Sequence, residues 1–370
     1  MKIICSKNEL LKGVNTVSKA VPVRTTFPIL ECILIEAGDD GIRLTANDME
    51  LGIETVIEGT VEETGMIALD ARIFSDIVRK LPDNDVVIQT GDTMMTDITC
   101  EKARFSILGK DAEEFSPLPQ VEKTKALKIS EFSLKELIRQ TIFSISDSEN
   151  NKIMTGELFE VKENILKVVS LDGHRISIRR IELAEVYEDI RVIVPGKSLI
   201  EISKILSGEL EDLVFIYFTQ NHILFEFGST KVVSRLIEGE YFKIEQMISS
   251  AYDTKVKVNK KEFLSCIDRA SLLVKENDKK PIILNITDEM MQLKIRSFIG
   301  SMDEEITIEK EGNDIMIGFN PRFFMDALRA IDDEEVTFYM VNPKAPCFIR
   351  DEEESYIYLI LPVNFNAADV

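Results

Sequence analysis

The sequence predicts an α+β protein built from three tandem copies of one domain, each with two helices packed on antiparallel sheets. Two repeated patterns support this prediction. A short strand followed by an amphipathic helix occurs three times, in "MKIICSKNELLKGVNTVSKAV", "LKISEFSLKELIRQTIFSIS" and "TKVKVNKKEFLSCIDRASLLV". A second strand-to-helix step also occurs three times, in "GMIALDARIFSDIVRKL", "RVIVPGKSLIEISKIL" and "DIMIGFNPRFFMDALRAI". The remaining segments of each copy form runs of strands without βαβ alternation, which favours antiparallel sheets.

The length of the chain agrees with several domains, because 370 residues exceed one ordinary domain. The second helix of each copy begins near Ala71, Gly196 and Asn320, so the repeat has a period of roughly 125 residues. The stretches "DAEEFSPLPQVEKTKA" and "MISSAYDTK" fall between copies and have the composition of linkers. We therefore predict domains at residues 1–122, 123–250 and 251–370.

Each copy has the same expected order of elements. A polar residue that can cap the helix precedes each amphipathic stretch. The stretches "FPILECILIEA", "MTGELFEVKEN" and "KPIILNITDEM" begin the hairpins, and "DNDVVIQT", "DLVFIYFTQNHILFEF" and "EVTFYMVNPKAPCFIR" close the copies. The predicted helices are Ser6–Ala20, Asp70–Lys80, Ser130–Ile142, Gly196–Ser207, Asn259–Lys275 and Asn320–Ala330.

Positive charge is concentrated on these six helices. The whole chain has a formal net charge of −21, which taken alone argues against a nucleic-acid partner. The predicted helices, however, hold sixteen Lys and Arg residues against nine Asp and Glu residues. Exposed helix surfaces favour Lys and Arg anyway, but this preference does not explain why the rest of the chain is so acidic. If the helices line one surface, that surface can hold phosphates while the remainder repels them.

Composition narrows the location of the protein. The first residues lack the apolar core of a signal peptide, and no apolar run is long enough to span a membrane. The five cysteines are odd in number and lack CxxC spacing, which is typical of reduced thiols in a cytosolic protein. We expect a cytoplasmic, nucleoid-associated protein without a metal or other cofactor.

The motif "LDGHRISI", Leu171 to Ile178, contains one of the two histidines together with an aspartate and an arginine. Its position between two apolar stretches predicts a hairpin tip. The first copy has "TANDMELGI" at the matching place, without the histidine or the arginine, so the repeated scaffold does not require these side chains. Asp172, His174 and Arg175 could form an active site, but we find no nucleophile or metal-ligand motif to accompany them. "VPGKS" resembles a phosphate loop but has Arg191 where that motif needs glycine.

The repeat and several motifs together resemble the bacterial DNA sliding clamp, the beta subunit of DNA polymerase III. The matching segments are "RTTFPIL", "NDMELGIE", "LDGHRISI", "VIVPGKSLIEI", "MIGFNPRFFMDAL" and the final "YLILPV". The resemblance implies the DNA clamp fold in a ring-forming, head-to-tail homodimer that encircles duplex DNA. Phosphate contacts alone carry no sequence information, so such a ring holds DNA without stopping at a site.

The resemblance also implies which residues face DNA and which join two protomers. Arg24 matches a residue of the family that contacts DNA, and the bases of the six helices are expected to face the duplex. The expected DNA-facing residues are Arg24, Lys12, Lys19, Arg72, Arg79, Lys80, Lys135, Arg139, Lys197, Lys204, Lys261, Arg269, Arg322 and Arg329. The expected dimer interface joins Arg104, Phe105 and Ile107 of the first domain to Leu272 and Leu273 of the third.

A further expectation is a pocket between the second and third domains. In the family this pocket receives short linear peptides of the replicative polymerase, the clamp loader and repair proteins, typically with a glutamine and a Leu-Phe end. The expected pocket residues are Met154, Leu171, Gly173, His174, Arg175, Ile176, Phe242, Met247, Asn320, Phe323, Leu359, Ile360, Leu361 and Pro362. Phe242 stands where the family commonly has proline, and Asn364 stands where the family often has arginine, so the resemblance leaves open which peptide binds best.

The sequence thus favours a non-catalytic processivity clamp over two alternatives. An enzyme centred on Asp172, His174 and Arg175 lacks partners for chemistry. A repeat scaffold that binds peptides but never DNA does not account for the basic helices.

Overall fold

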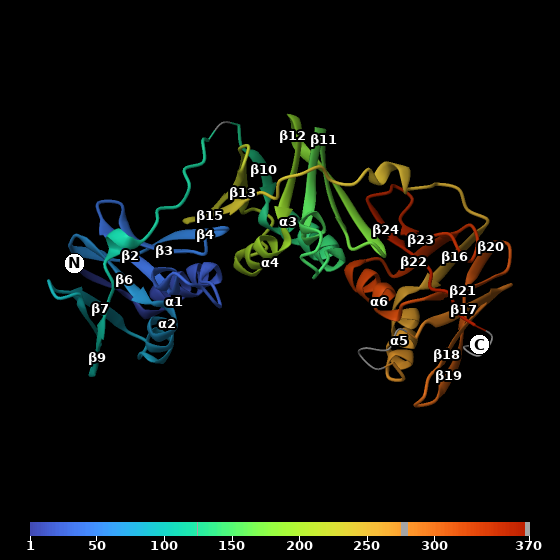
Figure 1. Ribbon diagram of the computed structural model, residues 1–370, viewed down its shortest axis with the longest axis horizontal. Helices are drawn as coiled ribbons and strands as arrows, with labels where there is room; N and C mark the ends of the chain where they lie inside the picture. Colours follow the sequence, from blue (N-terminus) through green and yellow to red (C-terminus); the bar gives the residue numbers. More distant parts are fainter. Residues whose placement is uncertain (124, 275–279, 367–370) are drawn as a thin grey trace. The chain divides into compact units, whose positions relative to one another are not determined.

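The computed structural model describes residues 1–123, 125–274 and 280–366 and forms two compact units (Figure 1). The first unit contains Met1–Lys135 with Lys197–Leu236, and the second contains Glu136–Gly196 with Ile237–Val370. Lys275, which the sequence assigns to the fifth helix, lies outside the described residues. Within the described ranges, no helix is both long and apolar enough to cross a membrane.

Two antiparallel sheets build the first unit. The five-stranded sheet consists, in spatial order, of β5 (Thr60–Glu63), β1 (Lys2–Ser6), β7 (Asp85–Thr90), β8 (Met95–Cys100) and β9 (Ala103–Leu108). The eight-stranded sheet consists of β10 (Leu127–Ser130), β13 (Leu213–Phe218), β14 (His222–Phe227), β15 (Thr230–Arg235), β4 (Leu51–Ile57), β3 (Gly41–Asn47), β2 (Cys32–Gly38) and β6 (Gly65–Asp70).

Two further antiparallel sheets build the second unit. The seven-stranded sheet consists of β11 (Gly156–Leu171), β12 (Arg175–Pro195), β24 (Tyr356–Ile360), β23 (Cys347–Arg350), β22 (Glu335–Met340), β16 (Thr254–Asn259) and β20 (Glu309–Gly312). The four-stranded sheet consists of β19 (Ser301–Thr307), β18 (Met290–Arg296), β17 (Ile282–Thr287) and β21 (Ile315–Phe319).

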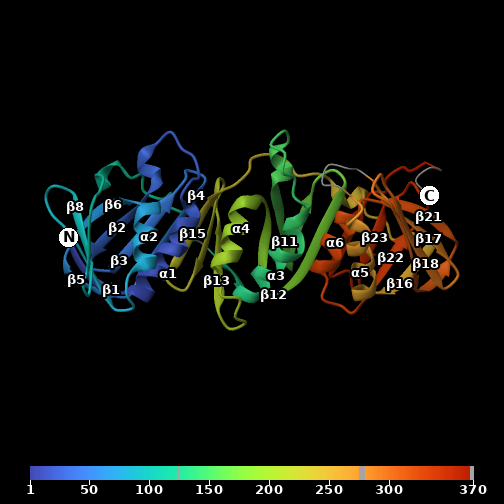
Figure 2. The same ribbon diagram turned by 90° about the horizontal axis from the view of Figure 1, so that it is seen from below.

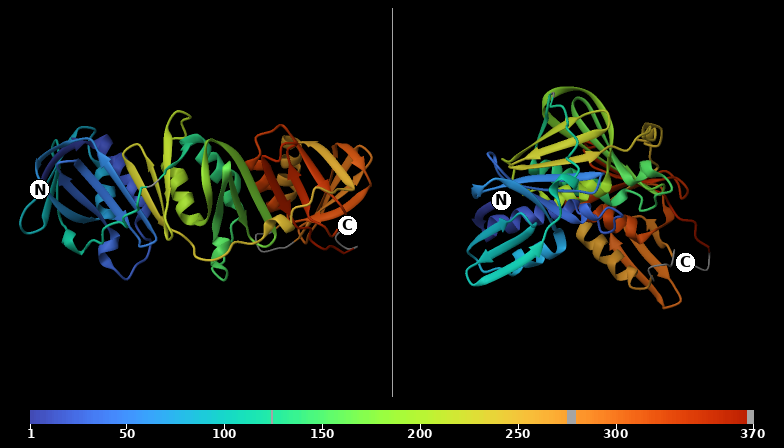
Figure 3. Two further views of the ribbon diagram at one scale, coloured as in Figure 1. Left: turned by 90° about the horizontal axis from the view of Figure 1, so that it is seen from above. Right: turned by 60° about the vertical axis from the view of Figure 1, so that its left-hand side comes forward.

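Neighbouring copies of the repeat share these large sheets. β15, the last strand of the second copy, pairs with β4 of the first copy, with Ser234 opposite Leu51 (Figure 3, left). β24, the last strand of the third copy, pairs in the same way with β12 of the second copy, with Ile360 opposite Arg175. The middle copy therefore contributes strands to both units, because each of its sheets continues into a neighbouring copy.

The described residues contain the six expected α-helices, namely α1 (Lys7–Val17), α2 (Ala71–Lys80), α3 (Glu131–Thr141), α4 (Gly196–Ile205), α5 (Lys260–Ser271) and α6 (Pro321–Ala330). Side-chain caps explain where several of them begin. The Asp70 carboxylate accepts a hydrogen bond from the Ile73 amide at 2.8 Å, and Asn259 accepts one from the Glu262 amide at 3.0 Å. α1 and α2 lie side by side within the first unit (Figure 2), and α5 and α6 contact each other within the second.

The fifth helix is shorter than the sequence predicts, since α5 ends at Ser271. The Leu272 amide donates to the Arg269 carbonyl oxygen at 3.2 Å, three residues back, which tightens and closes the last turn. Leu272 and Leu273 consequently lie beyond the helix.

The second unit has an aromatic core beneath α5 and α6. Phe263, Phe319, Phe324 and Phe338 are fully buried and pack mainly edge to face, with ring centroids 4.8–5.7 Å apart. The helices are thereby held firmly against the sheets, so that side chains at their starts have fixed positions.

A carboxyl group is also buried in the second unit. Glu157 on β11 has no exposed surface, and neither of its oxygens accepts a hydrogen bond from a described residue. The Thr141 hydroxyl donates instead to the Leu137 carbonyl oxygen at 2.6 Å. Burial without a charged partner raises the pKa of Glu157 from 4.5 to about 8.

We predict that Glu157→Gln removes a pH-dependent loss of stability. As pH rises from about 4.5 to about 8, the unfolded chain releases this proton while the folded chain keeps it, so the wild-type protein loses stability across that window. In thermal unfolding at a series of pH values, the melting temperature of the variant should rise relative to that of the wild type as pH approaches 8. Glu240→Gln, at an exposed position, serves as the control, and parallel curves for Glu157→Gln and wild type would contradict the prediction.

Candidate functional site

The hairpin tip between β11 and β12 is shaped by Asp172. Its Oδ1 atom accepts hydrogen bonds from the amides of His174 at 2.9 Å and Arg175 at 3.1 Å, and Gly173 has φ +89°. The tip between β3 and β4 has the same design, because Asp48 Oδ1 accepts from the amides of Glu50 and Leu51. The turn belongs to the repeated scaffold, whereas the histidine and the arginine belong to the second copy alone.

The Arg175 guanidinium group joins three parts of the second unit. Nε donates to Asp172 Oδ2 at 2.9 Å, Nη1 donates to Asp326 Oδ2 on α6 at 2.6 Å, and Nη2 donates to the Phe143 carbonyl oxygen. The guanidinium also lies 4.6 Å from the centre of the Phe323 ring. Its side chain is only 12% exposed, so most of Arg175 is buried beneath the pocket surface to which the sequence assigns it.

His174 lies at the surface beside Arg175. Its ring stacks on the Phe323 ring of α6, with centroids 6.1 Å apart and an angle of 21° between planes. Its carbonyl oxygen accepts a hydrogen bond from the Leu361 amide at 2.9 Å, and the Val363 amide donates to the Gly318 carbonyl oxygen at 2.8 Å. The segment after β24 is therefore attached both to the hairpin tip and to β21.

Six of the expected pocket residues share one apolar cluster. They are Met154, Leu171, Ile176, Phe242, Leu359 and Leu361. Leu171, Ile176 and Leu359 are buried and form the floor, while the other three are half-buried at its edge. Such a buried apolar floor with a few polar groups at its edge suits an anchor side chain of a ligand.

The remaining expected residues have other places. Ile360 belongs to the core on the opposite face of the sheet, because neighbouring strand residues point to opposite sides. Asn320 caps α6, its Oδ1 accepting from the Arg322 amide at 3.1 Å. Pro362 is half-buried, and Met247 is exposed and lies outside the apolar cluster.

The segment 241–248 is anchored to β11 by residues that sequence reasoning did not identify. The Tyr241 hydroxyl donates to the Val169 carbonyl oxygen at 3.1 Å, and Lys167 pairs with Glu245 at 3.2 Å. Lys167, Val169 and Leu171 follow one face of the strand, so alternation along β11 could have indicated this attachment. Asp326 was missed as well, although it lies three residues after Phe323 and hence on the same face of α6.

Most of the bases that the sequence assigns to the DNA-facing set are exposed. They are Arg24, Lys12, Lys19, Arg72, Arg79, Lys80, Lys197, Lys204, Lys261, Arg269, Arg322 and Arg329. The other two are only half-exposed. Arg139 binds Glu136 and also Asp332, the latter at 2.8 Å, and Lys135 donates to the Leu206 carbonyl oxygen at 3.0 Å. Their charges are less available to a ligand than the sequence suggests.

The expected dimer residues of the first domain lie on an edge strand, whereas Leu272 and Leu273 of the third domain lie just beyond α5. Arg104, Phe105 and Ile107 lie on β9, which ends the five-stranded sheet, and β19 ends the four-stranded sheet. Apolar side chains are exposed near both edges: Phe105 and Leu108 near the first, and Leu272 (78% exposed), Phe298 (100% exposed) and Ile299 near the second. Leu108, Phe298 and Ile299 were not identified from the sequence.

Reactive groups are scarce. All five cysteines are buried, and burial raises the pKa of Cys5 and of Cys266 to about 12, so these thiols stay protonated. Among the described residues, no cluster of His, Cys, Asp and Glu could hold a metal ion.

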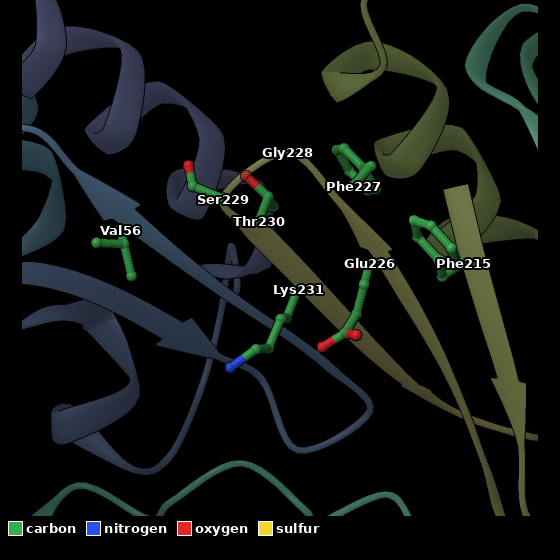
Figure 4. A pocket seen from close by; sticks show the side chains of 8 residues that line it. All are labelled: Val56, Phe215, Glu226, Phe227, Gly228, Ser229, Thr230 and Lys231. Carbon is green, nitrogen blue, oxygen red and sulfur yellow. The ribbon is translucent and has the colours of Figure 1, made fainter. Parts of the chain in front are cut away.

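A hollow of about 420 Å³ lies in the first unit between β4, β13, β14 and β15 (Figure 4). Its walls include Phe215 and Phe227. Its two charged side chains already have partners, since Glu226 binds Lys123 at 2.7 Å and Lys231 binds Glu54 at 2.9 Å. The hollow therefore presents apolar surface rather than a charged site.

Comparison with known proteins gives consistent matches along the chain. Sequence models of the DNA polymerase III beta subunit family match this chain in order. The model of the N-terminal domain matches residues 1–119, that of the central domain 128–243 and that of the C-terminal domain 245–364. The Beta sliding clamp of Staphylococcus aureus is 36% identical over 374 residues, covering 98% of this chain and 99% of that protein.

Solved structures agree with these matches. A crystal structure described as a DNA polymerase III beta subunit from Eubacterium rectale superimposes with a TM-score of 0.96 at 68% identity, covering 99% of this chain and 100% of the other. The DNA polymerase sliding clamp from Bacillus subtilis gives a TM-score of 0.95 at 37% identity, with the same coverage.

Proposed function

This chain belongs to the DNA polymerase III beta subunit family, and we propose that it acts as a DNA sliding clamp, a non-catalytic ring that tethers the replicative polymerase to duplex DNA. The observation that carries the proposal is the match of all three domain models in order, over nearly the whole chain. The three copies are proposed as domains 1–122, 123–250 and 251–370, and the protein is proposed to work in the cytoplasm at the nucleoid.

The proposed DNA contact uses the exposed bases of the helices. A chain with a net charge of −21 repels phosphates over most of its surface, so a surface with an excess of bases, such as the exposed faces of the helices, is needed to attract them. Contacts to phosphates alone are independent of sequence and depend on salt. Retention by enclosure, rather than by tight binding, then leaves the ring free to slide.

The proposed dimer repeats the contact that joins the copies within one chain. The last strand of a copy pairs with the strand after the hairpin tip of the preceding copy, as in β15 with β4 and β24 with β12. Two strands of these kinds remain at sheet edges, namely β9 and β19. Pairing β9 of one protomer with β19 of another continues the pattern and closes a head-to-tail dimer.

The internal contacts also give the register of this pairing. At the hairpin tip of the first copy, the Asp48 amide donates to the Leu51 carbonyl oxygen. At the tip of the third copy, the Ser297 amide donates to the Gly300 carbonyl oxygen, so Gly300 occupies the position in the repeat that Leu51 has in the first copy. Thr230 begins β15 and Ala103 begins β9, each directly after the turn of its hairpin, so these two residues correspond. Ile107, four residues after Ala103, then corresponds to Ser234, four residues after Thr230. Ile107 then lies opposite Gly300 of the other protomer, and Arg104 opposite Asp303.

Side chains at these positions are complementary. Arg104 and Asp303 take the places of Lys231 and Glu54, which form an ion pair at 2.9 Å. Phe105 and Leu272 take the places of Tyr358 and Phe143, whose rings lie 5.7 Å apart. The apolar side chains exposed in one chain would thus be covered by the partner protomer.

Partner proteins are proposed to bind the apolar cluster beside His174 through short linear peptides. The replicative polymerase, the clamp loader and repair proteins would share this pocket. The half-buried Met154 side chain lets the pocket adapt to several peptides, and the Phe242 ring at its edge narrows the choice among them.

We predict that the protein stays on a nicked circular DNA after loading by the matching clamp loader with ATP, and leaves when the circle is cut. Enclosure ends at a free DNA end, whereas adhesion to phosphates does not. Gel filtration of the DNA-bound protein before and after cutting measures both states. Equal retention on circular and linear DNA would contradict the clamp function.

We also predict that Arg104→Glu and Asp303→Arg each weaken the dimer and that the double variant restores it. One exposed ion pair is worth about 0.2–1 kcal/mol, and a charge reversal adds a repulsion of similar size. Since the ring has two such junctions, the dissociation constant of the dimer should rise about tenfold or more. Sedimentation over a concentration series measures this constant. Single variants with unchanged dimerisation, or a double variant that is not rescued, would exclude the proposed register.

A further inference from the structure

The two junctions between copies have the same backbone contacts. The Arg235 amide donates to the Glu50 carbonyl oxygen at 2.8 Å at the first junction, as the Leu361 amide does to His174 at 2.9 Å at the second. Asp48 and Asp172 shape the two hairpin tips alike. Both junctions therefore share the strand pairing, and at the first junction side chains add the Lys231–Glu54 ion pair at 2.9 Å.

The side chains at the second junction add a charged and aromatic cluster that the first junction lacks. Leu51 stands where the second junction has Arg175, as the strand registers show. At the start of α4, Ser198 stands where α6 has Phe323, and the Ser234 hydroxyl donates to its hydroxyl at 2.7 Å. The first junction forms without Arg175, Phe323 and Asp326, so these side chains can serve a role besides joining the copies.

The geometry of Arg175 shows what that is. Each of its three guanidinium nitrogens already has an acceptor, and only 12% of the side chain is exposed. A group so committed is a poor donor to an arriving ligand. The guanidinium does, however, lie against the Phe323 ring, and Arg175 directly follows His174 in the chain. Arg175 therefore fixes the positions of both stacked rings, those of His174 and Phe323.

We propose that Arg175 and Asp326 are positioning residues that hold the His174 and Phe323 rings in place as one wall of the pocket, and that the rings rather than the guanidinium contact the peptide. Asp326 lies three residues after Phe323 on α6, so its bond to Arg175 sets the position of the Phe323 ring relative to the hairpin tip. This inference rests on the proposed peptide pocket and assigns a role to Asp326 within it.

The test measures binding of a fluorescein-labelled pentapeptide that begins with Gln and ends in Leu-Phe, by anisotropy, to the full-length dimer. Asp326→Asn should weaken binding about tenfold, because neutralising one side of a half-buried ion pair loosens the group it holds. Asp326→Glu keeps the carboxylate and should recover most of the affinity. Asp268→Asn, which removes an exposed carboxylate from α5, is the matched control and should bind like wild type.

A second peptide, ending in Leu-Ala, separates positioning from a general structural effect. If Asp326 acts through the two rings, the loss caused by Asp326→Asn should shrink to less than about threefold with this peptide, since the aromatic anchor is gone. An equal loss with both peptides, or no loss with either, would overturn the inference. If the wild-type dimer binds neither peptide, the peptide pocket itself is wrong, whereas retention on circular DNA still tests the clamp.

Discussion

Antiparallel pairing between the last strand of one copy and the strand after the hairpin tip of the preceding copy is the interaction on which the structure depends. An isolated copy would leave both strands with unpaired amides and carbonyl groups, and such edges pair readily with any strand that fits. β15 with β4 and β24 with β12 satisfy the two inner edges. Among the described residues, one strand of each kind remains at a sheet edge, β9 and β19, and the proposed dimer pairs these two with each other. Such a pairing gives a head-to-tail assembly.

The same pairing creates the candidate peptide pocket. Because the Leu361 amide donates to the His174 carbonyl oxygen, the end of β24 lies beside the hairpin tip of the second copy. That places Leu359 and Leu361 next to Leu171 and Met154, which are distant in sequence. The first junction has the same backbone but lacks the histidine, the arginine and the aromatic ring. One scaffold thus supports both a junction without these side chains and the junction that carries the candidate peptide pocket.

Much of this architecture could be predicted from the sequence, because it is encoded locally. Capping residues such as Asp70 and Asn259 mark the starts of helices, and the threefold repetition of these signals predicts three copies. The α+β fold and the resemblance to bacterial sliding clamps are both confirmed. The likeness extends to the whole chain, so the clamp assignment does not depend on any single motif.

What the sequence did not provide depends on contacts between distant residues. The sequence assigns Arg139 to the DNA-facing set and Arg175 to the pocket, yet Asp332 and Asp326 bind them across 193 and 151 positions of sequence. Helix spacing places Asp326 on the face of Phe323, but no local pattern shows which arginine it binds. Ile360 is a different case. Adjacent residues of a strand point to opposite faces, so the alternation along β24 already indicates that Leu359 and Ile360 cannot both line the same pocket.

The central claim, that the dimer repeats the pairing found between copies, is tested most directly by a disulfide across the proposed interface. Ser106→Cys combined with Ser301→Cys places two thiols opposite each other, in a hydrogen-bonded strand pair whose Cα atoms lie about 5.5 Å apart. The five native cysteines are buried and should not compete. Mild oxidation should yield a covalent dimer on a denaturing gel, whereas Ser106→Cys with Asp303→Cys, two residues out of register, should yield little. Equal cross-linking of both pairs, or none of the first, would contradict the account.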